Sequence, residues 1–402
     1  IMVIDESKGG DAILARKNKV TSFDDLKGRT DIRVAFTPDS PSHYLAKAAA
    51  DHFNVPELLP SGKLRIETDG SEKAREKLIA GKTDIAICWE PDVSHALNNK
   101  EIIKILGTED TERLIVDILI VNRKFVRKEP EIIKLLLNNY FKTLKKYREN
   151  SNLLLSHVKK ETGLSEEAVK SMLKGVKWTN FTENCEKWFG ISAPGGYVNE
   201  DIINTIEATA MILVNTGDFS SNPIPDDDPY RLTNSSFLEE LFTRRTAVFT
   251  TPKPKSMTAG TVNLIEAKFS RLDEAGWNAL KEIGTLKVEP IVFQSGATEL
   301  DLLSKKIIDS AVERLEHYPN FRIIIKGHTS TMGDKEENLR LSKERAKAVA
   351  RYLDVVYNVN LNRLKTVGYG GAKPLPRKKN ESKRSWMYGL PRVELALVRE
   401  DY

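Results

Sequence analysis

The sequence predicts two folded parts, an α/β module over residues 1–248 and a smaller α+β domain over residues 285–402. The chain has 402 residues, which is too long for one domain, since domains usually hold roughly 100–200 residues. Hydrophobic residues make up 40% and charged residues 30%, the balance of a globular protein. Thr250–Gly260 is rich in proline and small polar residues without periodicity, which is typical of a connector. We therefore expect residues 249–284 to be a linker with a short helix around Leu264–Ile283.

The first part alternates strand and helix patterns. Ile32–Phe36 and Asp84–Trp89 are short apolar runs suited to strands of a covered parallel sheet, and Ile115–Val121 is expected to be another buried strand. Helices are predicted where apolar residues recur at helical spacing: Ser42–Phe53, Ser71–Ala80, Glu129–Arg148, Leu153–Glu161, Ser165–Leu173 and Glu200–Thr216.

In the second part, apolar residues recur at helical spacing over Asn338–Leu353, which predicts a long helix. Ala346, Val349 and Leu353 form one apolar face of this helix, which indicates that this face packs on a sheet.

Composition and motifs exclude several classes of function. No apolar run reaches the roughly 18–20 residues of a membrane span. Cys88 and Cys185 lie far apart without metal-ligand spacing, so we expect two buried thiols, with a disulfide between them as the alternative, and no metal or other cofactor. The chain lacks nucleophile-elbow, phosphate-loop and zinc-protease motifs, so an enzyme is not expected. It begins at Ile1, inside an expected strand and without signal-peptide features, and we expect a fragment or processed product.

The charge is uneven. Residues 288–402 carry a net charge of +6 and the remainder −1, with basic clusters at Arg377–Lys379 and Lys383–Arg384. No aromatic-interleaved basic stripe accompanies them, so a nucleic-acid partner is not expected. The basic loop is either a solvated surface or a contact for an anionic polymer or lipid headgroup.

Five segments of the first part resemble solute-binding proteins of the nitrate/sulfonate/taurine type: Asp5–Ile13, Leu26–Arg29, Asp39–Leu45, Leu78–Ala86 and Trp89–Asp92. The resemblance implies a type II periplasmic-binding-protein fold, in which two α/β lobes close on a small ligand for an ABC importer. It assigns residues 11–112 to the second lobe and residues 122–248 to the return into the first lobe. It also implies that the fold is incomplete at its N-terminus, with half of the ligand shell outside this sequence.

Two places in this module are candidate ligand contacts. Ser40, Ser42 and His43 stand where a strand meets a helix N-terminus, which favours an anion, although Ser40 could equally be an ordinary N-cap. Trp89 and Glu90 follow a strand, at the carboxyl edge where open sheets bind ligands. The alternative is that Trp89 is a core residue and Glu90 an exposed acid.

The second part resembles the OmpA-type peptidoglycan-binding domain, in the segments Phe293–Gly296, Ile323–Thr329, Asn338–Ala346, Gly368–Pro374 and Arg392–Glu394. The resemblance implies a β-α-β-α-β fold, with a strand near Ile291, a helix over Ser304–Tyr318, a strand over Arg322–Gly327, a helix over Asn338–Leu353, and strands over Lys365–Gly368 and Val393–Val398. In that family an Asp after Gly-His-Thr and the Arg of Leu-Ser-x-x-Arg-Ala hold the charged ends of diaminopimelate. Arg345 matches this Arg, whereas Ser330 stands where the family has Asp, and Pro391 replaces a further Arg. The resemblance makes these residues candidate peptidoglycan contacts: Thr329, Ser330, Asn338, Leu341, Arg345 and Arg392.

Other roles remain open for residues in and around this candidate site. Asp334 could supply the carboxylate that Ser330 lacks, Arg345 could be a solvent-facing helix residue, and His328 is expected to be a packed framework residue. The sequence thus predicts a protein of the periplasm or cell envelope that binds a small anionic or zwitterionic solute and is tethered to peptidoglycan, with an ABC permease as a candidate partner. The alternative is an envelope scaffold or sensor whose solute-binding fold no longer serves transport.

Overall fold

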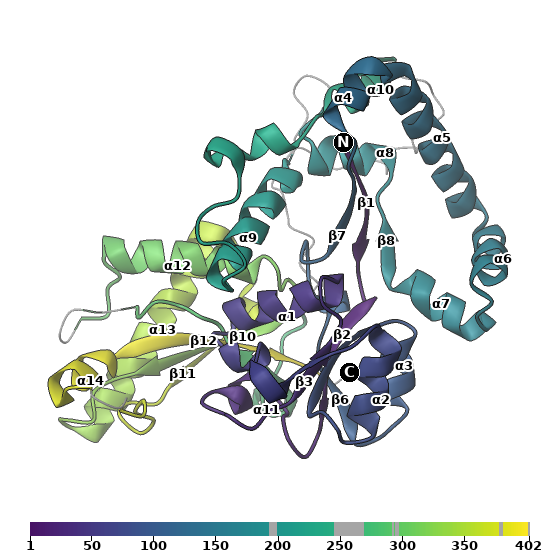
Figure 1. Ribbon diagram of the computed structural model, residues 1–402. Coiled ribbons are helices and arrows are strands. Elements are labelled where there is room, and N and C mark those ends of the chain that lie inside the picture. The colour runs from purple at the N-terminus through teal and green to yellow at the C-terminus, as the bar shows by residue number, and fades with distance from the viewer. Residues whose placement is uncertain (193–198, 245–268, 292, 294–296, 378–380, 401–402) are drawn as a thin grey trace.

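The computed structural model describes residues 1–192, 199–244, 269–291, 293, 297–377 and 381–400 (Figure 1). The described chain forms three sheets: a five-stranded sheet in the expected second lobe, a three-stranded sheet of crossing strands, and a four-stranded sheet in the C-terminal part. The expected linker Thr250–Gly260 lies outside the described residues.

The five-stranded sheet has the order β4-β3-β5-β2-β6. Its strands are β2 (Asp11–Arg16), β3 (Val34–Phe36), β4 (Arg65–Glu67), β5 (Ile85–Trp89) and β6 (Ile102–Gly107). Strand β3 runs parallel to β4 and β5, and β2 runs antiparallel to β5 and β6. The alternation of side chains along β2 explains the two covered faces: Ile13 packs in one core cluster with α1 (Pro41–His52), and Leu14 in another with α2 (Ser71–Ile79) and α3 (Asp92–Leu97).

The crossing strands have the order β7-β1-β8 and are all antiparallel. Strands β1 (Met2–Ser7), β7 (Val116–Leu119) and β8 (Val176–Trp178) rise from the five-stranded sheet to a cluster of helices at the top of Figure 1. The prediction of a buried strand at Ile115–Val121 was wrong in its burial, because the side chains of Ile118 and Ile120 are 46% and 79% exposed.

Helices make up the remainder of the first part. Their bounds are α4 (Arg123–Lys128), α5 (Pro130–Glu149), α6 (Ser151–Thr162), α7 (Glu166–Lys174), α8 (Phe181–Glu183), α9 (Asp201–Asn215) and α10 (Ser236–Arg244). Ser165 caps α7 by accepting a hydrogen bond from the N–H of Ala168, with two glutamates in the first turn.

The C-terminal sheet has the order β11-β10-β12-β9, with β10 parallel to β11 and the other pairs antiparallel. Its elements are α11 (Glu274–Ala279), β9 (Lys281–Thr285), α12 (Leu302–Leu315), β10 (Arg322–His328), α13 (Lys335–Tyr357), β11 (Leu364–Gly368), α14 (Lys383–Gly389) and β12 (Arg392–Arg399). Helix α13 buries Ala346, Val349 and Leu353, the face that the sequence predicted.

Two details of the C-terminal prediction were wrong. Ile291 is not in a strand; the edge strand is β9, which pairs with β12. The short helix expected up to Ile283 ends earlier, at Ala279, because Lys281–Thr285 forms this strand. The sheet therefore begins before residue 285.

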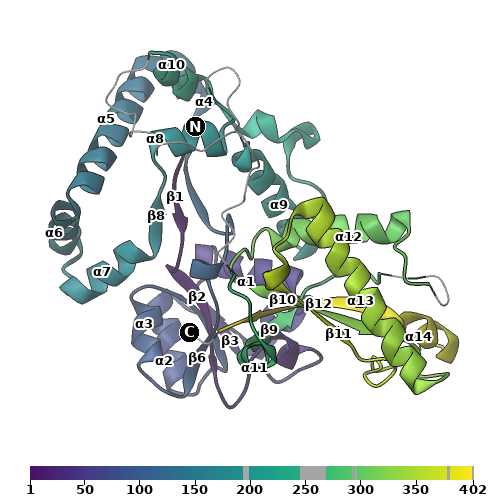
Figure 2. The same cartoon turned by 180° about the vertical axis from the view of Figure 1, so that it is seen from behind.

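The C-terminal sheet packs directly against the second lobe. One hydrophobic cluster contains Phe23 and Phe53 of the lobe together with Ile283 and Tyr318 of the C-terminal part. Gly284 lies so close to this surface that a Cβ there would stand 2.9 Å from the ring of Phe53, which explains glycine at this position of β9. Figure 2 shows β9 and α11 beside the five-stranded sheet.

The described residues hold neither a membrane-length apolar helix nor a cluster of three or more potential metal ligands. Cys88 and Cys185 are both buried free thiols, as the sequence predicted.

Candidate functional sites

The N-terminus of α1 uses its serines within the protein. Ser40 is the N-cap: its Oγ accepts a hydrogen bond from the N–H of His43 (3.2 Å) and donates to the carbonyl of Thr37 (2.7 Å). Ser42 is fully buried and donates to Oδ1 of Asp11 (2.7 Å). Both hydroxyl protons are therefore committed to protein acceptors, which matches the capping alternative more closely than a free anion site.

His43 is a packed residue in this structure. Its ring is 6% exposed and stacks on Phe36 at a centroid distance of 4.3 Å. Burial lowers the pKa of His43 to about 4, helped by the nearby charge of Lys47, so the imidazole is neutral at pH 7.

Trp89 and Glu90 lie at the C-terminal end of β5, beside Asp11 at the start of β2. Trp89 stands opposite Asp11 in the β2–β5 ladder and is half-buried. The N–H of Glu90 donates to the carbonyl of Gly10 (2.8 Å), and its carboxylate accepts from the hydroxyl of Ser94 (2.8 Å). The structure thus places Ser42, Trp89 and Glu90 close to Gly10 and Asp11, at the start of β2.

Asp11 is the residue that sequence reasoning missed. It is 7% exposed and accepts hydrogen bonds from the hydroxyls of Ser42 and Ser7, while Ser7 and Thr108 also share a hydrogen bond of 2.8 Å. Burial raises the pKa of Asp11, and the two hydroxyl donors oppose that shift. An acid at the first position of a strand, after two glycines, was the available signal.

A second acidic pair lies on the crossing strands. Asp5 of β1 stands directly opposite Asp117 of β7. Burial, together with the charge of Asp117, raises the pKa of Asp5 to about 7, because two close carboxyl groups resist ionising together.

The candidate residues of the C-terminal domain gather where β10 ends and α13 begins. Ser330 Oγ accepts from the N–H of Met332 (3.2 Å) and donates to its carbonyl (3.1 Å), and the amide of Asn338 donates to the same carbonyl (2.8 Å). The N–H of Thr329 donates to the carbonyl of Gly370 (2.9 Å). These bonds tie the turn after β10 to α13 and to the loop after β11.

Arg345 lies on the same side of α13 as Asn338 and the half-buried Leu341, by helical spacing. It is 3% exposed, so the alternative of a solvent-facing residue was wrong. Its Nε donates to the carbonyl of Ala297 (3.1 Å), and its guanidinium lies 5.0 Å from the ring centre of Phe293. Burial lowers the pKa of Arg345.

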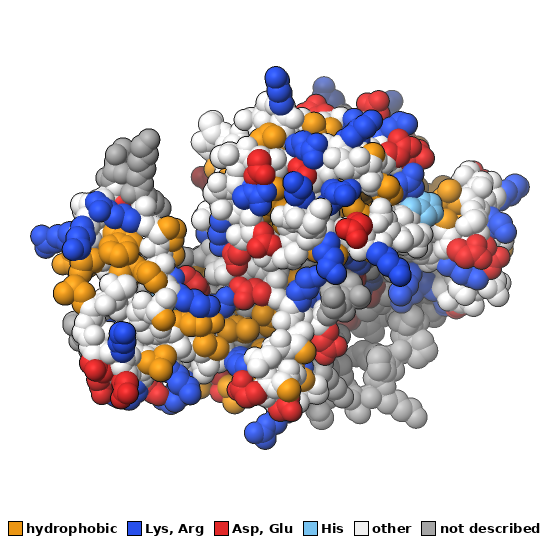
Figure 3. Space-filling model, turned by 90° about the horizontal axis from the view of Figure 1, so that it is seen from below, with side chains coloured by type: hydrophobic (Ala, Val, Ile, Leu, Met, Phe, Trp, Pro, Cys, Tyr) orange, Lys and Arg blue, Asp and Glu red, His pale blue; other side chains and the backbone are white. Residues whose placement is uncertain are grey.

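Three neighbouring residues have structural roles. Asp334 caps α13, because its Oδ1 accepts a hydrogen bond from the N–H of Glu337 (2.9 Å). Arg392 is 8% exposed, and its Nε donates to Oε1 of Glu394 (2.7 Å). His328 is 2% exposed and stacks on Tyr369, which fits the expected framework role. The C-terminal domain also exposes Leu375 (40%) and Tyr388 (70%). Figure 3 shows a patch of hydrophobic side chains beside Lys and Arg on the lobe at the left of that view.

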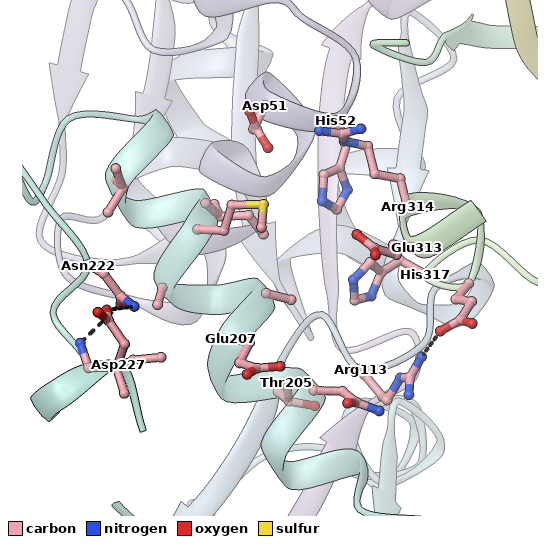
Figure 4. Close-up of a pocket in the computed structure, with 18 residues that line it drawn as sticks. Asp51, His52, Arg113, Thr205, Glu207, Asn222, Asp227, Glu313, Arg314 and His317 are labelled. Carbon is pink, nitrogen blue, oxygen red and sulfur yellow. Dashed lines mark hydrogen bonds and ion pairs between the residues drawn. The ribbon is translucent and has the colours of Figure 1, made fainter. Parts of the chain in front are cut away.

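A cavity of about 570 Å³ lies outside both candidate sites. It opens between the C-terminal end of α1, the length of α9 and the last turn of α12 (Figure 4), so both parts of the chain line it. Arg113 stands at one end, where its guanidinium pairs with Asp201 of α9 (3.0 Å) and Glu316 of the C-terminal part (2.7 Å).

Comparison with known proteins identifies the class of the C-terminal part: residues 292–386 match the OmpA family. The chain thus carries an OmpA-family domain. Over 85 residues it is 36% identical to a peptidoglycan-associated lipoprotein of Rhizobium meliloti, covering 21% of this chain and 48% of the relative. Over 95 residues it is 33% identical to the outer membrane protein Omp38 of Acinetobacter baumannii, covering 24% and 27%. The chain therefore spans about half or less of the length of each of these two relatives.

Solved structures resemble both parts. The periplasmic aliphatic sulphonate binding protein SsuA of Escherichia coli is 18% identical, covers 55% of this chain and 65% of its own, and superposes with a TM-score of 0.40. The peptidoglycan-associated lipoprotein of Burkholderia pseudomallei is 24% identical, covers 28% and 91%, and gives a TM-score of 0.24. Both resemblances noted in the sequence appear again here. The outer-membrane and peptidoglycan-associated relatives confirm the predicted location in the periplasm or cell envelope.

Proposed function

We propose that this chain is a non-enzymatic envelope protein that attaches to peptidoglycan through its C-terminal domain and presents a solute-binding-type α/β module. The match of residues 292–386 to the OmpA family carries the proposal. Two sets of relatives carry peptidoglycan in their names: the peptidoglycan-associated lipoproteins and the peptidoglycan-binding protein ArfA of Mycobacterium tuberculosis. The proposed division is a module over residues 1–248, a connector, and a wall-binding domain that begins with β9.

The proposed wall site comprises Thr329, Ser330, Asn338, Leu341 and Arg345, with Arg392 as a supporting residue. A guanidinium recognises a carboxylate through two parallel, charge-assisted hydrogen bonds, and Arg345 matches the Arg that holds the diaminopimelate carboxylate in the OmpA-type family. Its side chain rests on Phe293 and Ala297, so peptide binding would exchange the Ala297 contact for a carboxylate. At position 330 the family has an Asp that pairs with the ligand's ammonium group, whereas this chain has a serine hydroxyl. The loss of that charge weakens the proposed binding by about 1–3 kcal/mol relative to a domain with Asp.

The proposed solute of the α/β module is small and zwitterionic rather than a bare anion. Asp11 lies between Ser42 and Trp89, and a buried carboxyl at this place favours a ligand that carries an ammonium group. An ABC permease would be the partner of such a receptor. No nucleic-acid partner is proposed.

A scaffold or sensor is the second candidate function, and the packing between the two parts favours it. The C-terminal domain shares a hydrophobic cluster with the second lobe, and Lys287 pairs with Asp51 of α1 (3.1 Å). A module held rigidly at the wall is poorly suited to shuttle between ligand and transporter, but suits a fixed sensor.

Co-sedimentation of the full chain with purified diaminopimelate-type peptidoglycan tests the proposal. The chain should pellet with the polymer, and Ser330→Asp should increase the bound fraction. If both the unchanged chain and the Ser330→Asp variant stay in the supernatant, wall attachment is ruled out. A thermal-shift screen with taurine, sulfonates, nitrate and amino acids addresses the solute: a raised melting temperature supports the receptor, and its absence favours the scaffold.

A further inference from the structure

We propose that the cavity between α1, α9 and α12 is a binding site for a small organic cation, an ammonium group on an apolar body. This inference goes beyond the proposed function, because the cavity is separate from the wall site and from the residues around Asp11. Its volume of about 570 Å³ is within the range of small-molecule sites, roughly 300–1,000 Å³.

One wall of the cavity is apolar. Helix α9 contributes successive small and aliphatic side chains, and the segment after α9 adds Ile224, which is 6% exposed. The wall residues are Ala208, Ala210, Met211, Ile212, Val214 and Ile224. This surface suits the hydrocarbon portion of a ligand, because burying apolar area is the main favourable term in such sites.

The charged groups of the cavity favour a cation. Five carboxylates line it, against two guanidinium groups. Arg113 is held by Asp201 and Glu316, and Asp51 by Lys287, so these pairs are largely neutralised. Among the remaining carboxylates, Glu207 and Glu313 form no ion pair within the described residues. Figure 4 shows them on α9 and α12, on either side of the cavity.

A stacked histidine pair adds one hydrogen-bond acceptor, on His317. The ring of His317 lies 5.3 Å from that of His52, and both line the cavity. His317 Nδ1 lies 2.8 Å from the carbonyl of Glu112; since a carbonyl only accepts, this nitrogen carries the proton. Burial lowers the pKa of His317 to about 4, so Nε2 keeps its lone pair at pH 7. A neutral imidazole next to carboxylates suits a ligand that donates hydrogen bonds.

Isothermal titration of the full chain with phenethylammonium tests the site, with 3-phenylpropionate as an anion of similar shape. We expect saturable binding of the cation and none of the anion. Glu207→Gln and Glu313→Gln should each weaken binding by about two- to fivefold, and Ala208→Phe should abolish it by filling the cavity. The exposed helical residue Glu161 supplies the matched control, since Glu161→Gln removes an equal charge on α6 without an effect.

Three outcomes would overturn the inference: no binding of phenethylammonium at millimolar concentration, equal affinity for the anion, or unchanged affinity in the double Gln variant and in Ala208→Phe. Because Glu207 and Glu313 are exposed helix positions, their Gln variants should fold. Peptidoglycan sedimentation of the same variants should be unchanged, so failure of this site is distinguishable from failure of the proposed function.

Discussion

The hydroxyl of Tyr318 lies 2.8 Å from Nδ1 of His52, so a buried hydrogen bond joins the end of α1 to the C-terminal domain across 266 positions of sequence. Tyr318 is fully buried, and its ring also contacts Phe53 edge-on. A contact of this kind belongs to a domain core rather than to a transient surface. The two parts of the chain are therefore expected to unfold together.

Tyr318→Phe tests this junction. The change keeps the ring but leaves the imidazole of His52 without its partner, which should cost about 1–2 kcal/mol of the free energy of unfolding. Urea denaturation followed by fluorescence measures it. Tyr388→Phe, at a side chain that is 70% exposed, is the control and should change nothing. Equal midpoints for both variants would show that the junction contributes little.

Limited proteolysis tests the connector. The composition of Thr250–Gly260 predicts the first cut there. Because β9 and Tyr318 pack on the second lobe, we expect the two fragments to co-elute from a size-exclusion column after cleavage. Fragments that separate without denaturant would mean that the interface is weak and that the C-terminal domain is independent.

Acid should destabilise the junction through its histidines. The folded-state pKa of His317 is about 4, lowered by burial, and burial lowers that of His52 too. The unfolded chain, with an ordinary pKa near 6.5, binds protons first, so stability should fall as the pH drops from about 7 toward 4. His317→Gln should make the melting temperature less dependent on pH over this range, whereas His157→Gln, at an exposed position, should leave the pH dependence unchanged. A parallel decline in both variants would assign the acid sensitivity elsewhere.

The Asp5–Asp117 pair predicts the opposite dependence of stability on pH. Since the pKa of Asp5 is raised to about 7 in the folded chain, the native state holds this proton more tightly than the unfolded state. Its contribution is present below about pH 4 and is lost as the pH rises through 7. Asp5→Asn should therefore raise the melting temperature more at pH 8 than at pH 4, with exposed Asp69→Asn as control. A pH-independent effect would mean that Asp5 titrates normally.

Much of the fold could be predicted because its helices and central strands carry local signals. The α13 face follows from periodicity, β10 from the OmpA-type resemblance, and the start of α7 after Ser165 from capping chemistry. Strand β9 was missed because Lys281–Thr285 has only one apolar residue, Ile283, and its burial comes from Phe23 and Phe53 of the other part. Such a contact leaves no local pattern.

The candidate sites could be predicted only in part. Sequence motifs located Ser42, Trp89 and Arg345, and the structure places each in a cluster of polar contacts. They could not show that the hydroxyl of Ser42 is committed to Asp11, because that bond joins residues 31 positions apart. The cavity at α9 is likewise formed by segments that lie far apart in the sequence, and no motif marks it.

Arg345 carries the central claim of wall attachment, and the affinity of the full chain for purified diaminopimelate-type peptidoglycan tests it most directly. Arg345→Ala should weaken sedimentation by about 30- to 150-fold, the loss of a bidentate, charge-assisted contact of about 2–3 kcal/mol. Arg345→Lys should retain part of the binding. Arg340→Ala, an exposed arginine on the same helix, should bind as the unchanged chain does, with circular dichroism verifying that each variant is folded. Equal binding by folded Arg345→Ala and Arg340→Ala would contradict the account.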